Sequence, residues 1–293
     1  MNSSSSLTNI TLNKLNQMNQ ISKFIYNDKD ENPNQNLMII PPVENNAQIP
    51  LEYINEIWVS LIERESSNTY NYDAILAIQK DINSRMRTIL VDWLISVHSQ
   101  FHLKQSTLFL TVNIIDRYIS KKEILRSRFQ LLGITSLFIA CKYEEIGFPH
   151  ISYFVEFTAK TYTKTEILEM ESDILNILNF ELNLPSSINF YEILSLIYEF
   201  NKEEYKHGSF LLELYLLDAT CNKYLQSHIA LSVSYILLKK RNDEIWFNDV
   251  NNINMKFIRD NIKIIKECVQ EIKRNLDNNL KIKYTAVFEK YSM

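Results

Sequence analysis

The segment from Phe129 to Glu145 constrains the fold more than any other part of this chain. It reads FQLLGITSLFIACKYEE and is apolar on nearly every face, which predicts a helix buried all round. Such a helix needs a shell of other helices, and the charged residues at its exit, Lys142, Glu144 and Glu145, then have fixed positions. A rigid scaffold of this kind is typical of a protein that presents a surface to a partner.

A second helix is predicted from the segment MRTILVDWLISVHSQF. Its apolar residues recur at three- and four-residue steps, the stripe of a helix packed on one side. The stripe consists of Met86, Ile89, Leu90, Trp93, Leu94, Val97 and Phe101.

Composition favours an all-α fold. The 293 residues include only three glycines, while 46% are hydrophobic. Scarce glycine argues against sheet bulges, primed hairpin turns and phosphate-cradling loops. The length accommodates two domains of ordinary size with a real core.

Charge and cysteine content argue against several classes of function. With a net charge of −4 and no strongly basic domain, we expect no nucleic-acid binding. Cys141, Cys221 and Cys268 match no metal-ligand spacing, and we interpret them as buried thiols in a reducing compartment. No apolar run is long enough to span a membrane and no signal-peptide pattern is found, so we expect a soluble intracellular protein.

Periodicity and prolines divide the chain into four parts. Residues 1–47 are a Ser/Asn-rich tail without apolar periodicity, which we interpret as disordered. Residues 48–66 contain one amphipathic helix, which either packs on a domain or is held by a partner; its expected apolar face is Tyr53, Ile57, Trp58 and Leu61. Residues 67–183 and 184–293 are expected to form two consecutive five-helix domains, joined so closely that they make one rigid block.

The expected helices of the first domain lie near residues 86–101, 105–120, 126–144, 150–158 and 164–180. Those of the second lie near residues 187–199, 205–219, 223–240, 248–252 and 255–276. Ser106 or Thr107 can cap the second helix, and Thr163 or Thr165 can cap the fifth.

No catalytic or metal-binding constellation is found. His98 and His102 share a helix face, but no acidic residue accompanies them in a zinc-protease arrangement. Three isolated glycines cannot build the loop that covers ATP in a protein kinase. We therefore expect no enzyme activity, no cofactor and no metal.

Several segments resemble the cyclin box of A/B-type mitotic cyclins. MRTILVDWL (86–94), TLFLTVNIIDRYIS (107–120), ACKYEEI (140–146) and TYTKTEILEMESDILNILNFEL (161–182) are similar to successive parts of that box, without gaps. LYLLDATCNKYLQSHIA (214–230) and KIKYTAVFEKY (281–291) resemble the second box and its tail. The resemblance implies the double cyclin fold and a non-catalytic activating subunit of a cyclin-dependent Ser/Thr protein kinase, acting in the mitotic cell cycle in nucleus and cytoplasm.

The resemblance implies a kinase-binding site at the exit of the buried helix. Lys142 aligns with the family lysine that binds the kinase, and Glu171 aligns with the acidic partner of that lysine. Together they would hydrogen-bond both carbonyl and N–H groups of the kinase main chain, because a lysine donates and a carboxylate accepts. The positions that receive the kinase's C-helix align with Ile139, Tyr143, Leu175, Phe180 and Leu182. By position alone, Lys142 could be a solvated lysine that complements the helix dipole, and Ile139 and Leu175 could be core.

Two more sets of residues follow from the resemblance. Arg87 and Asp116, each amid apolar neighbours, are expected to form a buried structural pair. The docking patch for Arg-x-Leu substrates or inhibitors aligns with Met86, Ile89, Trp93, Phe129 and Gln130, although Ile89 and Trp93 could instead be core. Ser96 stands where many relatives carry a glutamate that pairs with the substrate's arginine, so selectivity for arginine should be weak.

Two alternative functions stay open. A transcription-class cyclin-fold protein would more often show a basic face or zinc-binding cysteines, and a helical adaptor that binds peptides without activating a kinase would not need Lys142 and Glu171 in register. The kinase, the cell-cycle stage and the degradation route are also open. The first arginine is Arg64, so the tail has no Arg-x-x-Leu destruction box.

Overall fold

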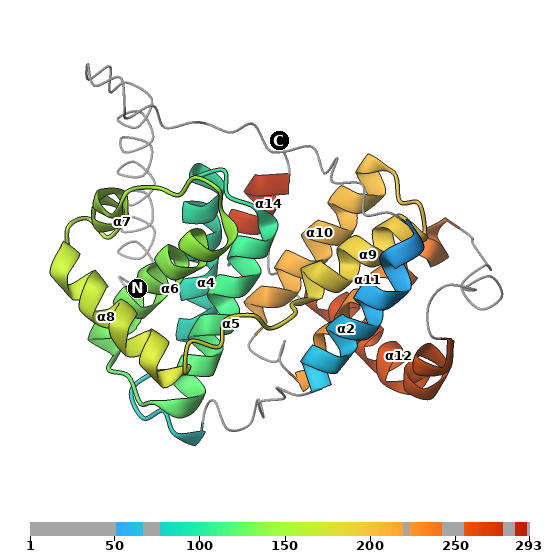
Figure 1. Ribbon diagram of the computed structural model, residues 1–293, viewed down its shortest axis with the longest axis horizontal. Coiled ribbons are helices and arrows are strands. Elements are labelled where there is room, and N and C mark those ends of the chain that lie inside the picture. Colours follow the sequence, from blue (N-terminus) through green and yellow to red (C-terminus); the bar gives the residue numbers. More distant parts are fainter. Residues whose placement is uncertain (1–50, 67–76, 219–222, 242–254, 278–284, 292–293) are drawn as a thin grey trace, which may run out of the picture.

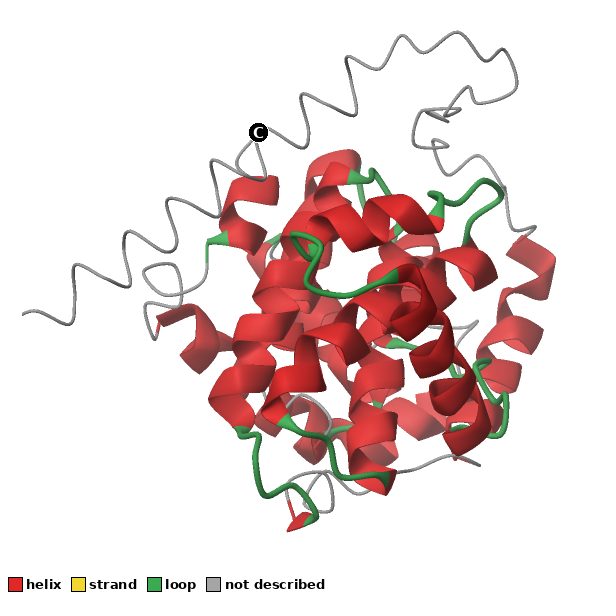
Figure 2. Ribbon diagram, turned by 90° about the vertical axis from the view of Figure 1, so that its left-hand side faces the viewer, coloured by secondary structure: helices red, strands yellow, loops and turns green. Residues whose placement is uncertain are grey.

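The computed structural model describes residues 51–66, 77–218, 223–241, 255–277 and 285–291. These ranges contain eleven α-helices, one short 3-10 turn and no strand. Figure 1 shows two groups of helices side by side, α4 to α8 in one and α9 to α12 in the other. Figure 2 shows the described helices joined mostly by short loops. The predicted all-α fold of two consecutive domains is confirmed.

The first domain is built around α6, Arg126–Glu144. Every residue from Phe129 to Cys141 is buried except Gln130, as the apolar sequence predicts. The helices of this domain that surround α6 are α4 (Ser84–Gln100), α5 (Gln105–Lys121), α7 (Ile151–Phe157) and α8 (Lys164–Ile177).

Helix ends differ from the prediction in two places. Thr163 and Glu166 form the expected capping box of α8, but α5 begins after Lys104 and receives no cap from Ser106 or Thr107. Helix α8 also ends earlier than expected, because the following Asn179 and Phe180 adopt positive φ values of 52° and 59°. The Phe180 N–H then closes the helix by donating to the Leu175 carbonyl at 2.9 Å.

The second domain contains α9 (Ser187–Ile197), α10 (Lys202–Leu217), α11 (Gln226–Lys240) and α12 (Met255–Asp277). The helix expected near residues 248–252 and Cys221 lie outside the described residues. One helix was not expected: α14, Ala286–Tyr291, lies in the segment interpreted as a tail and packs on α4 and α10 (Figure 1).

Helix α2, Ile54–Ser66, packs on the second domain. Its buried face is Ile54, Trp58, Leu61 and Glu65, with Ile57 half-buried, whereas Tyr53 is 54% exposed. Tyr53, predicted to belong to the apolar face of this helix, lies in the 3-10 turn before α2 and does not join its buried face. The Glu65 carboxylate accepts hydrogen bonds from the Ser227 N–H (3.0 Å) and hydroxyl (2.6 Å), and so fixes α2 to the start of α11.

The hydrophobic core of the second domain extends across the junction into the first domain. Val91 and Ile95 of α4 and Leu108 of α5 pack in the same cluster as the buried residues of α9 to α12. Arg87 spans the same junction: its guanidinium makes two hydrogen bonds of 2.7 Å to the Asp116 carboxylate and one of 2.9 Å to the Leu216 carbonyl. These contacts hold the two domains as one body.

Candidate partner-binding site

Lys142 and Glu171 come together at the surface of the first domain. Lys142 lies in the last turn of α6, and Glu171 lies in the middle of α8. The Lys142 ammonium forms an ion pair with the Glu171 carboxylate and lies 4.4 Å from the centre of the Phe138 ring. The side chains are 34% and 12% exposed, so both remain accessible to a partner.

Apolar side chains surround this pair at different depths. Tyr143 and Phe180 are 50% and 67% exposed. Leu175 and Leu182 are half-buried against the core of the first domain, and Ile139 is only 3% exposed. Of the five apolar residues predicted for the site, four reach the surface, while Ile139 lies beneath it.

Two further apolar residues belong to this surface but were not predicted. Ile146 is 83% exposed and Phe148 is 49% exposed, in the loop that follows α6. The Phe148 ring lies edge-on to Phe138, with centroids 6.5 Å apart. The available sequence signal was weak: two large apolar residues flank Gly147 in a segment without helical periodicity.

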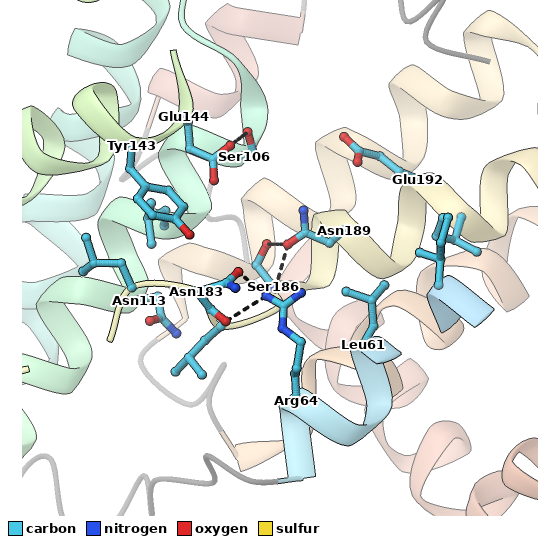
Figure 3. A pocket seen from close by; sticks show the side chains of 15 residues that line it. Leu61, Arg64, Ser106, Asn113, Tyr143, Glu144, Asn183, Ser186, Asn189 and Glu192 are labelled. Atoms are coloured by element: carbon cyan, nitrogen blue, oxygen red, sulfur yellow. Dashed lines mark hydrogen bonds between the residues drawn. The ribbon is translucent and has the colours of Figure 1, made fainter. Parts of the chain in front are cut away.

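A cleft continues this surface toward the second domain. It encloses about 250 Å³ between α2, α5, the end of α6, the 182–186 connection and α9 (Figure 3). Tyr143 and Leu182 belong both to the cleft and to the predicted site. Arg64 of α2 closes one side by donating a hydrogen bond of 2.8 Å to the Asn183 carbonyl. Sequence periodicity could not reveal the cleft, because its walls come from segments far apart in the chain.

One wall of the cleft is acidic. Burial, with a smaller contribution from nearby Glu144, raises the pKa of Glu192 to about 7. Figure 3 shows Glu192 on α9 and Glu144 at the end of α6, where Glu144 accepts a hydrogen bond of 2.9 Å from the Ser106 hydroxyl. The charge of this wall therefore changes around neutral pH.

The residues predicted for substrate docking lie on α4 and α6, which pack against each other. Ile89 is 51% exposed, Met86 and Trp93 are partly buried against the core, and Gln130 is half-buried. Phe129 is 4% exposed and belongs to the core, so it lies beneath these residues rather than beside them. Ser96 is half-buried, and its hydroxyl donates to the Asp92 carbonyl at 3.4 Å.

The described residues contain no group of three His, Cys, Asp or Glu that could hold a metal ion. His98 is buried, and burial together with the charge of Lys290 holds its pKa well below the usual range. Cys141 and Cys268 are buried free thiols, and burial raises the pKa of each. Among the helices described, none is long and apolar enough to cross a membrane.

Sequence comparison identifies the class of protein. The cyclin N-terminal domain matches residues 56–183, and the cyclin C-terminal domain matches residues 185–293. This chain belongs to the cyclin family.

Its curated relatives include A- and B-type cyclins, as the sequence resemblance predicted. Cyclin-A3-2 of Oryza sativa subsp. japonica is 36% identical over 82% of this chain and 64% of its own length. Cyclin-B2-1 of the same subspecies is 38% identical over 71% of this chain and 49% of its own length. The G2/mitotic-specific cyclin-B of Spisula solidissima is 32% identical over 85% of this chain and 57% of its own length. The chain thus spans about half to two thirds of the length of these relatives.

Solved structures share the fold. A viral cyclin from herpesvirus saimiri superposes with a TM-score of 0.60 at 19% identity, over 75% of this chain and 97% of that one. A chain of the yeast RNA polymerase II CTD kinase complex CTDK-1 superposes with a TM-score of 0.54 at 14% identity, over 76% of this chain and 73% of that one. Both support the double cyclin fold.

Proposed function

We propose that this protein is a mitotic cyclin of the A/B type, the activating subunit of a cyclin-dependent Ser/Thr protein kinase. The observation that carries the proposal is the meeting of Lys142 and Glu171, 29 residues apart in sequence, amid exposed apolar side chains on a cyclin domain. The subunit supplies binding energy rather than catalytic groups, and it needs neither a metal nor a cofactor.

The pair is suited to recognising main chain at the end of a partner's helix. The ammonium of Lys142 can donate three hydrogen bonds, and one of them is directed to Glu171. The Glu171 carboxylate has further lone pairs that can accept from partner N–H groups. The ion pair therefore orients both groups before binding, while each keeps hydrogen-bonding capacity for the kinase.

Activation follows from holding the kinase in one conformation. Kinase catalysis requires that a glutamate on the kinase's C-helix pair with the lysine that binds ATP. The rigid first domain would press this helix inward through Tyr143, Phe180 and Leu182, which flank the pair. Aromatic side chains such as Tyr143 commonly contribute much of the binding energy of an interface.

The cleft beside the pair offers a second contact. Kinases also require an ordered activation loop, and ordering a loop needs a surface against which it can rest. The cleft shares Tyr143 and Leu182 with the kinase-binding surface, so a segment of the same kinase could enter it. The two requirements would then be met from one continuous face.

Substrate choice is the further role proposed for α4. Exposed Ile89, with partly buried Met86 and Trp93, forms an apolar patch that could bind the leucine of Arg-x-Leu substrates or inhibitors. Ser96 provides no carboxylate for the arginine. The protein would act in the nucleus and cytoplasm, where it would meet its kinase and substrates.

A charge reversal at Lys142 tests the proposal. Lys142→Glu should abolish activation of a recombinant cyclin-dependent kinase subunit while leaving thermal melting unchanged, because Lys142 is exposed at a helix end. Lys160→Glu is the matched control: Lys160 also pairs with a glutamate, Glu156, but is 71% exposed in the turn that follows α7. Normal activation by Lys142→Glu would reject this site.

A further inference from the structure

The end of α6 and the start of α5 cap each other. A helix leaves N–H groups without partners in its first turn and carbonyl groups without partners in its last. Glu145, which follows the last residue of α6, accepts hydrogen bonds from the Lys104 N–H (2.7 Å) and the Thr107 hydroxyl (2.5 Å) at the start of α5. In return, the Lys104 ammonium donates to the Glu144 carbonyl, the last of α6, at 2.8 Å.

These contacts place each charge against the helix end of opposite sign. The Glu145 carboxylate lies at the positive end of α5, and the Lys104 ammonium lies at the negative end of α6, which is stabilising in both cases. The N-cap residue of α5, Lys104, provides no side-chain cap, and Glu145 supplies the acceptor for the Lys104 N–H instead. We call Lys104, Thr107, Glu144 and Glu145 the α5–α6 clasp.

The clasp lies next to the residues proposed to meet the kinase. Lys142 and Tyr143 precede Glu145 by three and two positions, and the chain beyond Glu145 leaves as a loop with an exposed Ile146. The last turn of a helix frays when its carbonyl groups lack partners. The clasp ties this turn to α5, whose body packs on α6 through a largely buried interface.

We propose that Lys104 and Glu145 are positioning residues for kinase recognition, because they fix the turn from which Lys142 and Tyr143 meet the partner. The inference rests on the function proposed for Lys142. Neither positioning residue has to touch the kinase. When the clasp is lost, a smaller fraction of molecules holds the turn in the binding conformation. The apparent affinity for the kinase falls in proportion to that fraction.

Glu145→Ala tests the proposal. It should raise the concentration of this chain that half-activates a recombinant cyclin-dependent kinase subunit by about tenfold, with unchanged maximal activity, since one helix cap is lost. Glu145→Gln keeps an oxygen acceptor and should have a smaller effect. The matched control is Glu204→Ala, which removes an acid that accepts from the Asn201 N–H at 2.9 Å at the start of α10, in the second domain. The control should leave half-activation unchanged.

A double mutant separates positioning from general stability. In a Lys142→Ala background, Glu145→Ala should weaken half-activation less than it does in the wild type, because the part of its effect that passes through Lys142 is already lost and only the part through Tyr143 remains. Three outcomes would overturn the positioning role: wild-type half-activation by Glu145→Ala, equal weakening by Glu204→Ala, or full additivity with Lys142→Ala. None of these three outcomes bears on the proposed function of the protein. That function is rejected by a different result, normal kinase activation by Lys142→Glu.

Discussion

Two of the ion pairs in the first domain have similar chemistry and different surroundings. Arg87 and Asp116 join α4 to α5 and are 3% and 1% exposed, whereas Lys142 and Glu171 join α6 to α8 and are 34% and 12% exposed. Arg87 also bonds the Leu216 carbonyl of the second domain. In the described part of the chain, the Lys142 ammonium faces one hydrogen-bond acceptor, Glu171.

Burial decides whether a charged pair stabilises the fold or stays available to a partner. The Arg87 guanidinium meets its partners inside the chain, so its removal strands a buried charge and weakens the fold. Lys142 keeps unused donors at the surface, so its removal costs little folding free energy and affects what binds there.

Arg87→Ala and Asp116→Ala should each lower the free energy of unfolding by about 3–5 kcal/mol, because each leaves one buried charge alone. The double mutant should lose less than the sum of the two single losses. Urea unfolding of the four proteins measures this coupling. Strict additivity would show that the two side chains do not interact. The contrast between a pair that stabilises the fold and the Lys142–Glu171 pair would then be wrong.

Lys290→Met should cost about 2 kcal/mol by leaving Glu213 without its cation. Glu213 is fully buried on α10, and its carboxylate accepts from the Lys290 ammonium at 2.6 Å and the Tyr291 hydroxyl at 2.9 Å, both on α14. Adding Glu213→Gln removes the stranded charge and should restore part of the loss in thermal melting. A Lys290→Met protein that melts like the wild type would show that α14 does not stabilise the junction.

Glu192→Gln should stabilise the protein at high pH only. The pKa of Glu192 rises from 4.5 to about 7 on folding, so stability is lost as pH rises through this window and stays lost above it. The glutamine variant avoids this loss and should gain on the order of 2 kcal/mol at pH 8, and nothing below pH 4.5. Melting across this range, with exposed Glu169→Gln as control, measures the gain. A gain that does not vary with pH would contradict the burial of this carboxyl group.

Ser96→Glu should leave stability unchanged and sharpen substrate choice. A carboxylate at this half-buried position of α4 could pair with the arginine of an Arg-x-Leu peptide, and an ion pair near the surface contributes up to about 1 kcal/mol. The measurement is the ratio of turnover for peptides with arginine or a neutral residue at that position.

Trp93→Ala should weaken phosphorylation of peptides that carry an Arg-x-Leu docking motif. Phosphorylation of short peptides that carry only the phosphorylation site should stay unchanged, because remote docking adds binding energy without touching the chemistry. Equal loss for both would show that Trp93 acts as core.

The sequence predicted long elements and failed where stability comes from distant partners. The apolar run of α6 and the periodicity of α4 identified both helices. The six-residue α14 was missed because so short a helix is not stable alone; it is held by Glu213 and by Asp92, which accepts from the Ala286 N–H at 3.3 Å. The cap of α5 was assigned wrongly for the same reason, since Glu145 lies 41 residues from Lys104.

The candidate site shows the same division. Lys142 and Glu171 followed from resemblance, because their register in the chain is preserved, and the structure brings them together. Ile146 and Phe148 have no periodicity to mark them, and the cleft draws on segments that only the fold unites. The types of residue in the sequence predicted the chemistry of the site. Only the structure shows which side chains are exposed and which segments lie next to one another.

The most direct test of the central claim is to exchange the two charges of the exposed pair. The double mutant Lys142→Glu/Glu171→Lys restores an ion pair within the chain but reverses the donor and the acceptor presented to the kinase. We predict wild-type melting and no activation of the kinase subunit, as for Lys142→Glu alone. Recovery of activation by the exchanged pair would contradict the account, because it would show that the pair serves the fold rather than the partner.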